Sequence, residues 1–242
     1  MKAIEVKDLH RYYNGVKAVQ GISFDVNDGE IFGFLGPNGA GKSTTIKVLT
    51  GQLRPTSGSA EVVGCDVVED RQELKPQIGV VFEYQNLYER LSARDNLQFT
   101  ARLYGAKKER VDEMLELVGL EDRSKERIQN YSNGMKQRLL IARALVHKPK
   151  VLFLDEPTRG LDPGVAREIR SIIANLVDSG VTVFLTTHYM EEADRLSDRV
   201  AILHQGEIVA IDTPEALKEA YGEEDRATLE DVFIKLTGKD LY

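Results

Sequence analysis

The sequence of 242 residues is poor in cysteine, in long apolar runs and in positive charge. With Cys65 as its only cysteine, the chain cannot form an internal disulfide, which fits a reducing compartment. We expect Cys65 to be a small buried hydrophobic residue. No stretch approaches the roughly 20 apolar residues that cross a bilayer, and the opening MKAIEVKDLHRYY lacks the apolar core of a signal peptide. With 32 basic and 39 acidic residues, the formal net charge of -7 argues against non-specific nucleic-acid binding. We therefore expect any role at a membrane to go through a partner protein.

A glycine-rich segment follows a short apolar run. Residues 31–35, IFGFL, precede GPNGAGKS at positions 36–43, the order strand, loop and helix. This pattern predicts a loop for the phosphates of a nucleoside triphosphate, because small residues let several backbone N–H groups approach one anion. Lys42 adds a positive charge, Ser43 offers a hydroxyl to Mg²⁺, and the helix directs its positive end at the anion. The predicted nucleotide-binding residues here are Gly36, Pro37, Asn38, Gly39, Ala40, Gly41, Lys42, Ser43 and Thr44.

The segments around this loop predict an α/β fold in one domain, residues 1–242. Near the N-terminus, apolar or alternating segments broken by turns predict antiparallel strands at residues 4–6, 16–19 and 22–26. From Ala93 onward, apolar residues recur at helical spacing and predict an inserted helical subdomain over about residues 86–148. The chain then alternates strand and helix, which predicts a mainly parallel sheet covered on both faces. Helix starts at Thr213 and Thr228 predict a short helical tail over about residues 214–242.

Two carboxylates follow the apolar run at residues 151–154. Asp155 and Glu156 would lie at the carboxyl end of a buried strand, which is where open α/β sheets bind ligands. Phosphoryl transfer to water needs charge neutralisation and a group that orients or deprotonates the water. Asp155 suits the shell of Mg²⁺, directly or through water, and Glu156 suits the base. Without the phosphate loop, a helix cap or turn would be the preferred explanation of the pair.

Together these segments resemble the nucleotide-binding cassettes of ABC transporters, in the order of that family and over nearly the whole chain. Residues 131–135, YSNGM, stand where the family has its LSGGQ signature. The resemblance implies a P-loop NTPase core, ATP and Mg²⁺ as ligands, and ATP hydrolysis. It also implies a homodimer in which Ser132, Asn133 and Gly134 cover the ATP held by the other copy. A simple helix cap at Ser132 or Asn133 is the alternative explanation of this segment.

Three further residues carry the likeness. Asp162 ends TRGLD at positions 158–162, which resembles the family's D-loop with arginine where serine is usual, and it is also a good helix start. His188, after the apolar segment 181–186, resembles the switch histidine that reaches the γ-phosphate, although a lone histidine is often only a hydrogen-bonded structural residue. Tyr13 resembles the aromatic residue that stacks on adenine, with Tyr12 as its competitor and core packing as the other possibility.

One departure from the family falls after residues 78–82. The family usually has glutamine where this chain has Glu83, and an ionised carboxylate only accepts hydrogen bonds. Glu83 remains a candidate ligand of Mg²⁺, but it adds negative charge near the γ-phosphate. We expect slower hydrolysis or a stronger dependence on Mg²⁺. Gln85 is the alternative if the loop shifts.

The segments YSNGMKQRL, TRGLDP and ATLEDVFIKLTG further resemble the ATPase subunits of ABC-2 exporters. This resemblance implies a peripheral protein on the cytoplasmic face of the cell membrane, attached to an integral-membrane permease, with no nucleic-acid partner. Tyr84, Leu87, Tyr88 and Leu91 then either form a patch for the permease or belong to the core of the helical insert. An importer ATPase, a soluble ABC-type ATPase acting on ribosomes or DNA, and a small-molecule kinase are the competing hypotheses.

Overall fold

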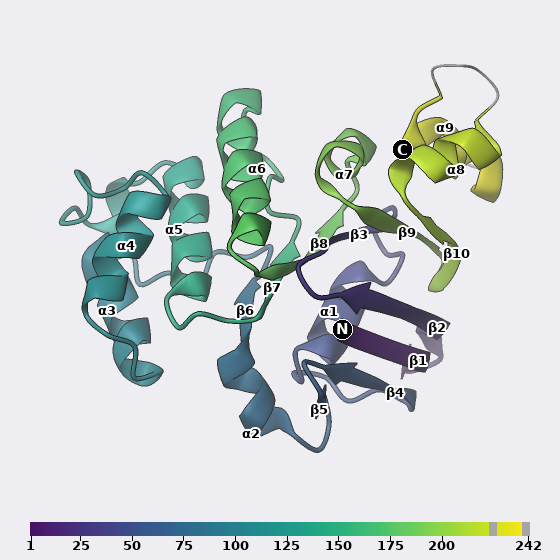
Figure 1. Cartoon of the computed structure of the whole chain (residues 1–242), viewed down its shortest axis with the longest axis horizontal. Coiled ribbons are helices and arrows are strands. Elements are labelled where there is room, and N and C mark those ends of the chain that lie inside the picture. The colour runs from purple at the N-terminus through teal and green to yellow at the C-terminus, as the bar shows by residue number, and fades with distance from the viewer. Residues whose placement is uncertain (223–226, 239–242) are drawn as a thin grey trace.

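The computed structural model describes residues 1–222 and 227–238. Residues 223–226 and 239–242 of the predicted tail lie outside this part. Within it, the chain forms two sheets with helices around them, and Figure 1 shows α3, α4 and α5 on one side of the molecule and the antiparallel strands on another. No helix in the described ranges has both the length and the apolar character to cross a membrane.

The larger sheet has six strands in the order β10-β9-β3-β8-β7-β6. All its neighbouring pairs are parallel except β10 with β9, so the prediction of a mainly parallel sheet is confirmed. β3 and the strands on either side of it are buried along most of their length, because helices cover one face, and a helix together with the smaller sheet covers the other. The strands are β3 (Ile31–Leu35), β6 (Ile78–Val81), β7 (Val151–Asp155), β8 (Thr182–Thr187), β9 (Arg199–His204) and β10 (Glu207–Asp212).

The smaller sheet is antiparallel, as predicted, in the order β2-β1-β4-β5. The prediction of separate strands at residues 16–19 and 22–26 is wrong, because β2 runs unbroken through both. Gly21, at φ 71°, takes a left-handed conformation and has no partner between the pairs His10 with Gln20 and Leu9 with Ile22, so the strand bulges there and continues. The strands are β1 (Lys2–Tyr13), β2 (Val16–Asn27), β4 (Ser57–Val62) and β5 (Cys65–Asp66).

Several helices begin at capping residues that the sequence indicates. Ser92 and Thr228 each form a capping box with the aspartate three residues later, and the Thr213 hydroxyl accepts from the backbone N–H of Ala216, which confirms these three helix starts. Helices α3 to α5 fall within the range predicted for the insert, whose boundaries stay a prediction. The helices are α1 (Lys42–Leu49), α2 (Arg71–Leu74), α3 (Ala93–Leu103), α4 (Glu109–Leu117), α5 (Asn133–Leu145), α6 (Pro163–Asp178), α7 (Met190–Leu196), α8 (Pro214–Tyr221) and α9 (Leu229–Thr237).

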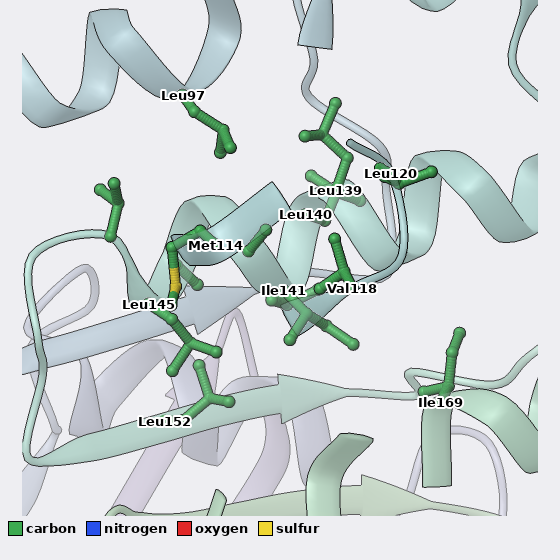
Figure 2. Packing of buried hydrophobic residues seen from close by; sticks show 14 of the residues in the cluster. Leu97, Met114, Val118, Leu120, Leu139, Leu140, Ile141, Leu145, Leu152 and Ile169 are labelled. Carbon is green, nitrogen blue, oxygen red and sulfur yellow. The ribbon is translucent and has the colours of Figure 1, made fainter. Parts of the chain in front are cut away.

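Two apolar clusters fix the helices and the small sheet to the large one. Figure 2 shows side chains of α3, α4 and α5 packed together, with Leu152 of β7 and Ile169 of α6 completing the cluster. On the other side, Phe24 of β2 stacks on Phe32 of β3 with ring centroids 5.5 Å apart, inside a cluster that contains the buried and unpaired Cys65. The loop between β3 and α1 therefore lies where both sheets meet.

Candidate functional site

The loop between β3 and α1 closes around its own lysine. The Lys42 ammonium is buried and donates hydrogen bonds to the carbonyl oxygens of Gly36, at 2.6 Å, and Pro37, at 3.2 Å. A Cβ at Gly36 would lie 2.4 Å from the Leu203 carbonyl oxygen, and one at Gly41 would lie 2.4 Å from the Ala18 carbonyl oxygen. Only glycine fits this approach of three backbone segments, so the loop has the shape that an anion-binding site requires.

The loop opens on a cavity of about 150 Å³. Its wall contains two cations, Lys42 and Arg159, and two carboxylates, Glu83 and Glu156. Seven predicted loop residues line it, whereas Gly36 and Ala40 do not. The sequence did not indicate Ala18 or Arg159 as part of this wall. The loop residues that line the cavity are Pro37, Asn38, Gly39, Gly41, Lys42, Ser43 and Thr44.

A chain of hydroxyl and carboxylate groups extends from the loop into the sheet. The Ser43 hydroxyl donates to Asp155 Oδ1 at 3.3 Å, and the Thr186 hydroxyl donates to the same oxygen at 2.6 Å. Asp155 is the last residue of β7 and is paired in register with Thr186 of β8, which places the two side chains together. Sequence reasoning missed Thr186, although the pairing of two parallel buried strands would have indicated it. Ser43 and Asp155 offer oxygen ligands of the kind that Mg²⁺ prefers.

Glu156 lies between Lys42 and His188. Its Oε1 is 3.1 Å from Lys42 Nζ, and its Oε2 is 2.7 Å from His188 Nδ1. The side chain is only 4% exposed, and the backbone has φ of 53°, a left-handed conformation that costs energy in a residue with a Cβ. The backbone N–H of Glu156 donates to Thr186 O at 3.1 Å, which holds this conformation. The structure thus brings both predicted catalytic residues together.

The remaining predicted site residues lie apart from the cavity wall. Tyr13 is exposed and has the Arg11 guanidinium over its ring, at 4.5 Å from the centroid, while the hydroxyl of its competitor Tyr12 lies 2.9 Å from His10 Nδ1. Ser132 is the N-cap of α5, and its hydroxyl accepts from the Met135 N–H at 3.2 Å. Asn133 is exposed in the first turn of α5, whereas Gly134 in the same turn is buried. Asp162 is exposed and is the N-cap of α6.

Glu83 forms an ion pair that the sequence did not indicate. Its carboxylate accepts a hydrogen bond from Arg159, which belongs to the turn between β7 and α6. The side chains are 30% and 43% exposed, so the pair stands at the mouth of the cavity.

Thr158, in the same turn, contacts a buried acid. Its hydroxyl donates to Glu192 Oε1 of α7 at 2.6 Å, and Glu192 is 2% exposed. Burial raises the pKa of the Glu192 carboxyl above its ordinary value, because few polar groups replace the water that would stabilise the charged form. The turn after β7 is therefore fixed at two points, through Thr158 to α7 and through Arg159 to the segment after β6.

Comparisons with known proteins point to one family. Residues 19–159 match the family model described as ABC transporter. The chain is 43% identical over 225 residues to the daunorubicin/doxorubicin resistance ATP-binding protein DrrA of Streptomyces peucetius. The matched region covers 91% of this chain and 68% of DrrA. The chain is also 49% identical over 203 residues to the fluoroquinolones export ATP-binding protein Rv2688c of Mycobacterium tuberculosis (strain ATCC 25618 / H37Rv). This match covers 84% of the chain and 67% of Rv2688c. The chain belongs to the ABC transporter family.

A solved structure extends this result to the fold. The ATP-binding cassette MJ0796, a dimer in a post-hydrolysis state with ADP and Pi, matches with a TM-score of 0.77 and 28% identity over 87% of this chain and 98% of that one. This ABC transporter chain is accordingly an ATP-binding subunit with a P-loop NTPase core, and it is an ATPase. The predicted family, fold class and enzyme class are confirmed.

Proposed function

We propose that the chain is the ATP-hydrolysing subunit of an ABC-type exporter and that it drives a separate permease. The observation that carries the ATPase site is the convergence of Lys42, Ser43 and Glu156 on one cavity, with Asp155 in contact with Ser43 and His188 in contact with Glu156. The export direction is supported by relatives whose names refer to drug resistance and fluoroquinolone export. We transfer no substrate from them to this chain.

The loop residues bind the phosphates, and Lys42 supplies the charge. Ser43 and Asp155 would hold Mg²⁺, whereas the carboxylate of Glu83, the third predicted ligand, is held by Arg159 in the structure. Their fit to the ion is supported by the 3.3 Å contact between Ser43 and Asp155, which directs two oxygen atoms at one place beside the loop. When bound, Mg²⁺ supplies positive charge that neutralises the phosphate oxygens.

Glu156 is the proposed general base. In the structure its Oε1 is engaged by Lys42, so entry of the triphosphate must move that ammonium from the carboxylate to the phosphates. The freed Oε1 then accepts a proton from water as the water oxygen bonds to the γ-phosphorus and the bond to the ADP oxygen breaks, which yields ADP and phosphate. His188, at 2.7 Å from Oε2, orients the carboxylate for this transfer.

A second copy of the chain is the proposed partner at the nucleotide. Ser132 and Asn133 are exposed at the start of α5, where a helix presents unpaired N–H groups and positive potential. Asp162 is exposed at the start of α6. These groups suit contact with the ATP held by another copy, and the dimeric form of MJ0796 supports such an assembly. Tyr13 is the proposed adenine contact, and its exposed ring is free on at least part of its surface for stacking.

The permease would attach at an apolar patch on α3 and the segment before it. Tyr84 is 82% exposed, Tyr88 is 51% exposed and packs edge-on against Phe99 of α3, and Leu103 is 71% exposed. Such a concentration of exposed apolar side chains is typical of a protein contact. Leu87 instead packs against the core of the insert, so the predicted segment divides between the two roles. Attachment here would make the chain a peripheral protein on the cytoplasmic face of the membrane.

The test uses the isolated chain in two steps. Glu156→Gln should form an ATP-dependent dimer on size exclusion, because slow hydrolysis keeps the nucleotide in place. Adding Ser132→Arg should abolish this dimer by steric clash and leave ATP binding to the monomer intact, and Arg123→Ser, a surface change elsewhere in the insert, is the control. A dimer that survives Ser132→Arg would exclude the proposed interface.

A second experiment tests the permease contact by affinity capture of the tagged chain from membranes. The capture should bring down an integral-membrane protein, and Tyr84→Asp combined with Leu103→Asp should prevent this. Capture of ribosomes instead would contradict the transport role.

A further inference from the structure

The ion pair between Glu83 and Arg159 joins the ends of two neighbouring strands. β6 and β7 pair in parallel, with Val81 opposite Leu154, so their carboxyl ends meet at the cavity. Glu83 follows β6 by two residues, and Arg159 lies in the turn after β7. Their side chains meet across the mouth of the cavity, whose wall includes both. The pair therefore connects two segments that each carry groups for the nucleotide.

The same turn contains the proposed base. The backbone N–H of Arg159 donates to the carbonyl oxygen of Glu156 at 3.2 Å, so the two residues are held in one turn. A shift of Arg159 would be transmitted through this bond to the strained backbone of Glu156, at φ 53°. Among the described residues, the Arg159 side chain forms its hydrogen bond and ion pair with Glu83 and none with Lys42, Ser43 or Asp155, so it acts on the site through its neighbours.

The charges of the cavity balance in pairs. Lys42 faces Glu156, and Arg159 faces Glu83, so the two cations and two carboxylates of the wall sum to zero. A bare Glu83 would add a negative charge where the triphosphate enters and would oppose binding.

We propose that Arg159 is a positioning residue that neutralises Glu83 and thereby sets the affinity of the site for ATP. The inference rests on the proposed nucleotide site and names one further residue that governs it. Because the pair is partly exposed, its effect is moderate and falls as salt screens the charges. Arginine and glutamate are thus a compensated pair, and changing either one alone unbalances the cavity.

The experiment is a double-mutant cycle read by nucleotide binding. The parent, Arg159→Ser, Glu83→Gln and the double variant are titrated with a fluorescent non-hydrolysable ATP analogue at low and high salt, with Mg²⁺ and with a chelator. Arg159→Lys retains the charge, and Arg123→Ser breaks another exposed pair, with Glu126, as the matched control. Circular dichroism verifies that each variant is folded, and the KM and kcat of hydrolysis are measured in parallel.

Arg159→Ser should weaken binding by roughly three- to tenfold at low salt, and by less at high salt. Glu83→Gln should strengthen binding by a similar factor, while the double variant should return to within about twofold of the parent. The rise in KM should exceed any fall in kcat, and Arg159→Lys should retain most of the affinity. Should Arg159→Ser not fold, the Glu83→Gln and Arg159→Lys titrations still decide between the outcomes.

Two results would overturn the inference. Unchanged affinity in Glu83→Gln and Arg159→Ser would mean that the pair has no influence on the nucleotide. Single variants that change the affinity in the same direction, or a double variant that stays several-fold away from the parent, would mean that the two charges do not compensate each other. Failure of the parent protein itself to bind the analogue would be a different result, since it would remove the proposed nucleotide site and not only the role of Arg159.

Discussion

The contact of Glu156 with Lys42 predicts that Glu156→Gln has opposite effects on stability and on nucleotide binding. Both side chains are nearly buried, at 4% and 6% exposure, and their charged atoms are 3.1 Å apart. Without nucleotide, glutamine leaves the ammonium with a neutral acceptor and with the carbonyl oxygens of Gly36 and Pro37. With nucleotide, Lys42 has phosphate partners and no longer needs the carboxylate.

The magnitude follows from the type of bond that is lost. Hydrogen bonds to charged groups contribute about 1.5–3 kcal/mol and neutral ones about 1 kcal/mol, so the exchange costs the free protein about 1–2 kcal/mol. At about 2–4 °C per kcal/mol for a chain of this size, the Tm should fall by about 2–8 °C. The variant also need not break this pair when ATP enters, so its affinity should rise by about 5- to 30-fold. Loss of the base should slow turnover by about 10² or more.

The assay compares thermal unfolding and binding of a non-hydrolysable ATP analogue in the same preparations. Glu30→Gln is the matched control, because Glu30 is equally buried and does not line the cavity. Its Oε1 forms an ion pair with the Arg199 guanidinium at 3.2 Å. The control should be destabilised with no change in affinity. The reasoning is refuted if Glu156→Gln binds the analogue no more tightly than the parent. Unchanged turnover would show that the base is misassigned.

Two further predictions concern stability. Gly134→Ala should lower the free energy of unfolding by about 1–3 kcal/mol in urea titrations, because its Cβ would lie 2.4 Å from Val165 Cγ1 of α6. Gly164→Ala is the control and should change the free energy of unfolding little, since its Cβ would make only an ordinary contact. A gain from Gly134→Ala would contradict the packing of α5 on α6. Because burial raises the pKa of Glu192 above 4.5, the native state holds this proton more tightly than the unfolded chain, so its contribution to stability falls as the pH rises above about 4.5. Glu192→Gln should therefore lose less stability than the parent between about pH 5 and pH 8, and parallel pH profiles would contradict this.

The order of elements was predictable because it depends on local patterns. The glycine loop, the buried run before Asp155 and the capping residues Ser92, Thr213 and Thr228 each determine backbone conformation over a few residues. The bulge at Gly21 was not predictable, because a glycine between two apolar segments is equally compatible with a turn that ends the strand. What decided it was pairing with β1, which is a contact between segments.

The contacts between side chains at the site were predictable only in part. Asp155 and Glu156 were identified because a buried strand precedes them, and His188 because of its position after another. Their partners were not identified, since Thr186 depends on strand register and the pairing of Glu83 with Arg159 depends on the path of two loops. Tertiary geometry of this kind leaves no periodic signal in the sequence.

The pairings in the cavity suggest why carboxylates can stand so close to a triphosphate site. Each carboxylate in the wall has a cation partner in the structure, and the cations are the groups that a nucleotide would attract. Entry of ATP therefore replaces Glu156 by phosphate as the anionic partner of Lys42. The same exchange frees Glu156 Oε1 only once phosphate has arrived, so the base becomes available when its substrate is present. Affinity and reactivity are coupled through one lysine, which is why we expect Glu156→Gln to change both in opposite directions.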